Sequence, residues 1–99
     1  MGLISDLQSR KETIEQGKLL AREFGQRLTT ERIADTKRVA AEFEVLAGNA
    51  LGFQRRVKLG VLGTSSLVNT FQWALVEEGY PKDFAHEIGN QLAVKLAAD

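Results

Sequence analysis

The stretch that decides the fold is SSLVNTFQWALVEEGYPKDFAHEIGNQLAVKL, residues 65–96. Large apolar residues recur in it at steps of four on both sides of Gly79: Leu67, Phe71 and Leu75 before the glycine, then Phe84, Ile88, Leu92 and Leu96. This spacing places each set on one face of an α-helix. Because glycine commonly ends a helix and proline commonly begins one, the Gly-Tyr-Pro step predicts a turn between helices at about 65–78 and 81–97.

The N-terminal half carries a weaker helical pattern with one break. Its apolar seam has heptad spacing and consists of Leu7, Ile14, Ala21, Phe24 and Leu28. The next apolar residue in the row is Ile33, and a five-residue step cannot stay on one face of a straight helix. We therefore expect two antiparallel helices, at about 5–24 and 30–47. Gly25 would end the first of them. A single helix bent at Thr29 is the alternative.

The connection at 48–64 is rich in glycine and holds four of the nine glycines. It predicts an irregular link that is extended or briefly helical. Within it, residues 53–61 alternate between apolar and polar, which is typical of a strand, but a lone strand would need a partner such as its twin across a two-fold axis. The whole pattern predicts an all-α fold, a small four-helix bundle with residues 1–99 as one domain.

Composition excludes several kinds of chemistry. The chain has no cysteine and a single histidine, so disulfides, thiolate catalysis and cysteine-based metal sites are ruled out. Thirteen basic residues balance thirteen acidic ones, which removes the overall positive charge that holds nucleic acid or an anionic membrane. The absence of cysteine agrees with a cytoplasmic protein.

One glycine-containing stretch, LGVLGTSSLVNTF, residues 59–71, resembles a phosphate-binding loop. Such a loop requires the pattern G-x-x-x-x-G-K-[ST], whose lysine reaches the phosphates. Here Thr64 stands in the lysine position and Lys58 in the position of the first glycine. We interpret the stretch as a link followed by a helix that Ser65 or Ser66 caps, and we expect no nucleotide and no other cofactor.

The only histidine, His86, lies in the sequence HEIGN. The zinc helix H-E-x-x-H needs a second histidine where this chain has Asn90. Asp83 and His86 also stand three apart, as in di-iron bundles, but that site needs a second such pair and two further carboxylates. The sequence therefore predicts no metal site and no enzyme.

The narrow N-terminal seam favours a protein partner. Arg10 and Gly17 interrupt it, so these helices need a further surface to bury their apolar residues. We expect a small regulator, adaptor or inhibitor of a larger protein that acts as a homodimer. The expected partner interface is the whole seam: Leu7, Ile14, Ala21, Phe24 and Leu28.

Two other classes of partner are weaker alternatives. A basic patch of Arg55, Arg56 and Lys58 favours a nucleic-acid-associated accessory protein, but the neutral net charge speaks against it. Residues 59–76 carry no charge, and their length of eighteen residues is near the lower limit for a membrane span. Their two glycines and several polar side chains favour a buried core helix instead.

Overall fold

The computed structural model describes the backbone of residues 3–98 and the side chains of residues 10–98. It contains four α-helices and one short 3-10 turn: α1 (Leu3–Arg27), η1 (Thr30–Arg32), α2 (Thr36–Val57), α3 (Val61–Glu77) and α4 (Lys82–Ala98). No strand occurs among these residues. The prediction of an all-α chain with four helices is therefore confirmed.

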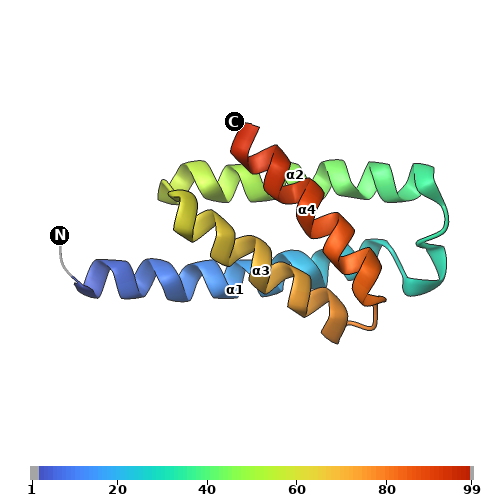
Figure 1. Ribbon diagram of the computed structural model, residues 1–99, viewed down its shortest axis with the longest axis horizontal. Coiled ribbons are helices and arrows are strands. Elements are labelled where there is room, and N and C mark those ends of the chain that lie inside the picture. Colours follow the sequence, from blue (N-terminus) through green and yellow to red (C-terminus); the bar gives the residue numbers. More distant parts are fainter. Residues whose placement is uncertain (1–2, 99) are drawn as a thin grey trace.

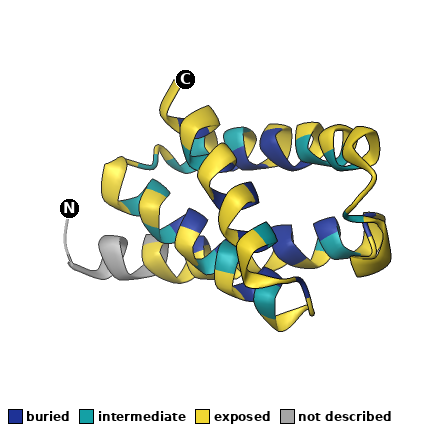
Figure 2. Cartoon of the chain, turned by 45° about the vertical axis from the view of Figure 1, so that its right-hand side comes forward, coloured by how far each residue is buried: buried dark blue, intermediate teal, exposed yellow. Residues whose placement is uncertain are grey.

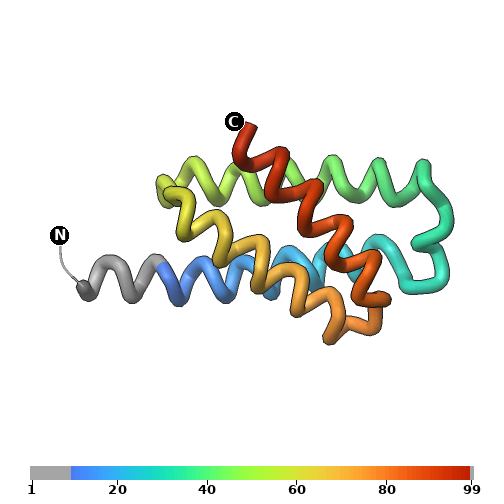
Figure 3. The backbone as a smooth tube through the Cα atoms, in the orientation of Figure 1, coloured from blue at the N-terminus to red at the C-terminus, as the bar shows by residue number. Residues whose placement is uncertain are grey.

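The two long helices α1 and α2 run antiparallel, and α3 and α4 cross them diagonally (Figure 1). Helix α3 packs mainly against α1, whereas α4 packs against α3 and α2. The molecule is elongated, with principal extents of 46 × 26 × 19 Å. Helix α3 has 17 residues, and its two ends lie far apart (Figure 3).

The predicted hairpin of the first two helices is correct, and the single bent helix is wrong. Helix α1 continues through Gly25 to Arg27, because Phe24 and Leu28 on either side of the glycine are buried in the core. That burial outweighs the cost of a glycine inside a helix, about 1 kcal/mol. Helix α2 begins later than expected, after Asp35, whose carboxylate accepts a hydrogen bond from the Arg38 backbone N–H at 3.2 Å.

A second contact of Arg38 ties the hairpin together. Its guanidinium donates to the backbone carbonyl oxygen of Arg27, at 3.2 Å. This carbonyl belongs to the last residue of α1 and has no acceptor role inside the helix. A cation at the C-terminal end of a helix also interacts favourably with the helix dipole.

The predicted irregular connection at 48–64 is wrong, and residues 53–61, for which a strand is the alternative, are helical except at 58–60. Helix α2 runs on to Val57 and α3 already begins at Val61, which leaves three residues between them. The buried face of this part of α2 consists of Leu46, Ala47, Ala50 and Phe53. These residues recur at steps of three and four, and their burial outweighs the two glycines of the segment, Gly48 and Gly52, which lie on the exposed face.

The sharp corner between α2 and α3 depends on a left-handed residue. Lys58 has φ 56° and ψ 53°, and the backbone N–H groups of Lys58 and Leu59 both donate to the Gln54 carbonyl oxygen. This is a Schellman-type helix end built without glycine. Helix α3 then starts after Gly60, without a side-chain cap, so the expected caps at Ser65 and Ser66 lie inside the helix instead.

The turn between α3 and α4 follows the prediction closely. Gly79 has φ 107°, and its N–H donates to the Val76 carbonyl oxygen at 3.0 Å. The Tyr80 N–H donates to the Leu75 carbonyl oxygen at 3.2 Å, which completes a Schellman motif. Helix α4 begins at Lys82, one residue after the expected start at Pro81.

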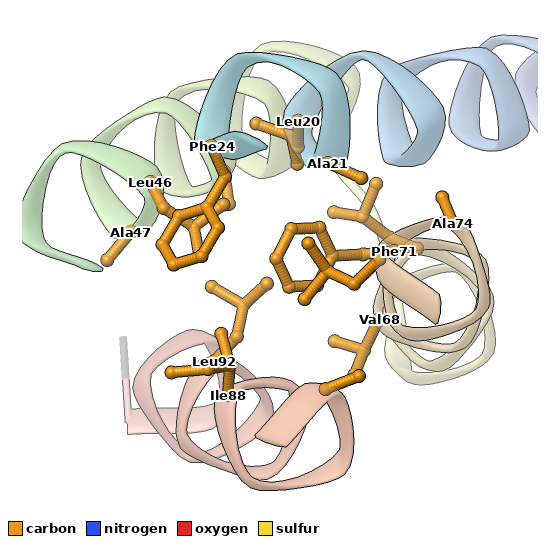
Figure 4. Packing of buried hydrophobic residues seen from close by; sticks show 14 of the residues in the cluster. Leu20, Ala21, Phe24, Leu46, Ala47, Val68, Phe71, Ala74, Ile88 and Leu92 are labelled. Atoms are coloured by element: carbon orange, nitrogen blue, oxygen red, sulfur yellow. The ribbon is translucent and has the colours of Figure 1, made fainter. Parts of the chain in front are cut away.

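The core lies between the long helices and the crossing pair (Figures 2 and 4). Its central aromatic contact joins Phe24 and Phe71, whose ring centroids are 6.2 Å apart in an edge-to-face arrangement. The predicted stripes of α3 and α4 are buried in it except for Phe84, which is half-buried, and Phe71, Leu75 and Leu92 are completely buried.

Two glycines permit the close helix crossings. A Cβ on Gly17 in α1 would lie 2.9 Å from the Thr70 Cβ and 3.2 Å from the Leu67 carbonyl oxygen, both in α3. A Cβ on Gly89 in α4 would overlap the side chain of Gln72 in α3. These contacts pack the middle of α3 closely against α1 and α4.

Candidate functional site

Most of the predicted partner interface belongs to the core of the chain. Ala21, Phe24 and Leu28 have exposed fractions of 0%, 2% and 0%. Ile14 is 36% exposed. The side chain of Leu7 lies outside the described residues. The structure therefore does not bring the seam together as one apolar surface, and it leaves Ile14 as the exposed seam member among the side chains of residues 10–98.

The predicted basic patch lies at the end of α2. Arg55, Arg56 and Lys58 are all exposed, in the last turn of the helix and in its cap. The guanidinium of Arg56 lies 5.3 Å from the centroid of the Phe53 ring, a cation–π contact that orients the side chain. No acidic residue occurs between Val45 and Val76, so the sequence around the patch carries only positive charge.

Two apolar side chains that follow this patch in the sequence are largely exposed. Val61 is 83% exposed and Leu62 is 87% exposed, both in the first turn of α3. Their exposure was not predicted, because the sequence pattern favours Ser65 or Ser66 as the start of this helix. A signal was available: an apolar pair stands directly before the buried stripe of the helix. We call the five residues Arg55, Arg56, Lys58, Val61 and Leu62 the α2–α3 corner.

A hollow of about 440 Å³ opens beside the α2–α3 corner, where α2 ends, α3 begins and α4 ends. Its lining residues include Leu59, Val61, Val68, Ala93 and Leu96. Below it, the Gln54 amide nitrogen donates to the Thr64 hydroxyl at 3.2 Å and to the Leu96 carbonyl oxygen at 3.3 Å. These hydrogen bonds join the three helices and give the hollow a fixed floor.

A second surface lies at the opposite end of α3. A pocket of about 240 Å³ is lined by Gln72, Trp73, Val76, Lys82, Asp83, Ala85 and His86. We call it the Trp73 pocket. Trp73 is 55% exposed, and the Lys82 ammonium lies 5.9 Å from its ring centroid. The pocket therefore combines an accessible aromatic face with charged side chains on its rim.

The residues that resembled known chemical motifs are arranged otherwise. Gly60 precedes α3 and Gly63 lies inside it, and the described part of the chain has no strand to support a phosphate-binding loop. Asp83 and His86 both line the Trp73 pocket. Within the described residues, no three histidine or acidic side chains gather into a group that could hold a metal ion.

None of the helices of the described residues is both long enough and apolar enough to cross a bilayer. The uncharged stretch at 59–76 instead supplies most of α3, whose inner face is buried in the core.

Comparison with protein-family models, with curated proteins and with solved structures finds no match for this chain. The α2–α3 corner and the Trp73 pocket are therefore the features of the chain that bear on its function.

Proposed function

We propose that the protein is a small non-enzymatic protein-binding module, a regulator, adaptor or inhibitor that docks on a larger protein through the α2–α3 corner. One observation carries the proposal. Val61 and Leu62, the two most exposed large apolar side chains of the described residues, stand beside a patch of like-charged side chains. Such a surface fits a partner that is apolar at its centre and acidic at its rim.

Burial of these two side chains supplies a driving force for association. Each stabilises a complex by about 1.5–3 kcal/mol if it passes from full exposure to full burial. Part of that gain offsets the loss of translational and rotational freedom. Arg56 and Lys58 contribute less to affinity but select an acidic surface and speed the encounter.

A nucleic-acid partner remains the second candidate, on the strength of the basic patch alone. The exposed aliphatic pair does not contribute to phosphate contacts. The nearest aromatic ring, Phe53, is 4% exposed and lies beneath Arg56, so it offers no platform on which a base could stack. A neutral chain also releases few counterions on binding.

We still propose self-association, but through a surface other than the N-terminal seam. Three of the five seam residues are buried inside the chain, so the seam offers little apolar area to a second copy. Among the exposed apolar side chains, Val61 and Leu62 instead lie at the start of α3, and Trp73 lies in its second half.

The test is site-specific photo-crosslinking in the native host, with a photoreactive amino acid at Leu62. Ala41 is the control position, since it is exposed in the first half of α2, away from the corner. We expect adducts with another protein chain from position 62 and few from position 41. Adducts from both positions alike, or adducts with nucleic acid from position 62, would contradict the proposal.

A further inference from the structure

We infer that copies of this chain associate head to tail. The α2–α3 corner of one copy binds in the Trp73 pocket of a second copy, so each chain carries both surfaces of the contact. This inference rests on the proposed function of the corner. It names the occupant of that corner as another molecule of the same chain.

Charge complementarity is the first argument. One acidic residue lines the Trp73 pocket, and two more lie on the helices that form it. Glu77 lies one helical turn after Trp73, Asp83 lines the pocket, and Glu87 lies one turn after Asp83. All three are exposed, and Lys82 adds one positive charge to the pocket lining. The corner of a second copy presents exposed cations, among them Arg56 and Lys58; Glu23 of α1 lines a hollow together with Arg56, so Lys58 is the cation farther from that carboxylate along the chain.

Apolar complementarity is the second argument. The corner projects two aliphatic side chains, Val61 and Leu62, that nothing in the described chain covers. The Trp73 pocket offers an indole ring with 55% of its surface exposed, next to Val76. An aliphatic side chain that enters a partly aromatic pocket, with charges at the rim, is the usual arrangement of an interface anchor.

The geometry makes the contact intermolecular. The corner and the pocket lie at opposite ends of α3, a helix of 17 residues, so one copy cannot close the contact on itself (Figure 3). A head-to-tail pair leaves one corner open on one copy and one pocket open on the other. A dimer is therefore the smallest assembly, and further copies add to it or close a ring.

Trp73 is the only tryptophan in the chain, so its fluorescence reports on this pocket alone. We expect its emission to shift to shorter wavelength as the concentration of purified protein rises, and to return to the dilute value when salt is added. Burial of the indole gives the shift, and screening of the charges gives the reversal.

Charge reversal identifies the two surfaces. One variant combines Arg56→Glu with Lys58→Glu, and a second combines Glu77→Lys with Glu87→Lys. Two controls carry matched changes on α1, namely Lys11→Glu with Lys18→Glu, and Glu12→Lys with Glu15→Lys. Far-ultraviolet circular dichroism shows that each variant is folded, and sedimentation velocity measures association.

We expect each surface variant to associate at least about tenfold more weakly than the wild type, because like charges then face each other. An equimolar mixture of the two surface variants should regain association, since their reversed charges are again complementary. The α1 controls should behave as the wild type does.

Two results would overturn the inference: a wild-type chain that stays monomeric up to concentrations on the order of 100 μM, or association that the surface variants leave unchanged. The proposed function is judged separately. If position 62 crosslinks to a different protein while the purified chain is monomeric, the corner is a docking site but the Trp73 pocket is not its partner.

Discussion

The hydroxyl of Tyr80 donates a hydrogen bond to the backbone carbonyl oxygen of Leu28, which joins the α3–α4 turn to the end of α1. The two residues are separated by 52 positions in the chain, and both are buried. The Tyr80 ring also stacks on Phe84, with 5.4 Å between the ring centroids. This contact fixes the turn that follows Trp73 and therefore supports one wall of the Trp73 pocket.

Replacement of Tyr80 by phenylalanine should destabilise the fold by about 1–3 kcal/mol, because the Leu28 carbonyl oxygen then lacks its partner in a buried site. The ring and its stacking are preserved in this variant, so the loss measures the hydrogen bond. Urea unfolding followed by circular dichroism gives the free energy. A stability equal to that of the wild type would mean that water satisfies the carbonyl instead.

Alkaline pH should weaken the fold through the same residue. Burial raises the pKa of Tyr80 above its ordinary value near 10, and the negative charge of Glu78 raises it further. The folded state therefore holds the phenol proton more tightly than the unfolded state. This contribution to stability is fully present below about pH 10 and is lost as the pH rises above it.

Tyr80 is the only tyrosine, so the absorbance of tyrosinate follows its ionisation without interference. We expect its titration midpoint in the folded protein to lie above that in denaturant. The Tyr80→Phe variant should lose less stability above about pH 10 than the wild type does. Equal midpoints in the folded and denatured protein would contradict this prediction.

Glycine replacements should have opposite signs in α1 and α2. Gly17→Ala places a methyl group against the stiff Thr70 side chain and the backbone of α3, and should cost about 1–3 kcal/mol even though alanine favours a helix. Gly48→Ala and Gly52→Ala meet nothing within 4 Å and should each stabilise α2 by about 0.5–1 kcal/mol. Thermal unfolding compares the three variants, and a destabilised Gly52→Ala would mean that this face of α2 is covered in solution.

These glycines also show why the sequence predicted the helices but not all their ends. A glycine count does not distinguish a helix end from a helix interior. Gly79 ends a helix because no buried stripe continues through it, whereas Gly25, Gly48 and Gly52 lie inside helices whose apolar faces continue past them. Tertiary burial decides such cases, and it depends on distant residues that a local pattern does not reveal.

The candidate site was predictable only in part, for the same reason. The closely spaced cations at 55–58 predicted the basic patch. The exposure of Val61 and Leu62 was not, because an apolar residue at a helix start is equally compatible with burial. The Trp73 pocket depends on the packing of α4 beside α3, which no single segment encodes.

Lys58→Gly should separate stability from binding at the α2–α3 corner. Lysine at φ 56° is strained, and glycine there should stabilise the fold by up to about 1 kcal/mol. The same change removes one cation from the corner and should weaken association. Lys58→Ala is the matched control, since it removes the charge but keeps the strain. If both variants unfold at the same denaturant concentration, the left-handed backbone at Lys58 is not a source of strain.

The seam of α1 gives the last prediction, which distinguishes a core role from an interface role. Phe24 has ring centroids of Phe71, Tyr80 and Phe84 within 6.5 Å, and it is 2% exposed, so Phe24→Ala should cost about 3–5 kcal/mol. Ile14→Asp, at a position with 36% exposure, should leave the helical circular dichroism signal largely intact. If the Trp73 pocket is the partner surface, this variant should also sediment as the wild type does. If the Ile14→Asp variant is folded but monomeric while the wild type associates, the interface lies on α1 and not at the ends of α3.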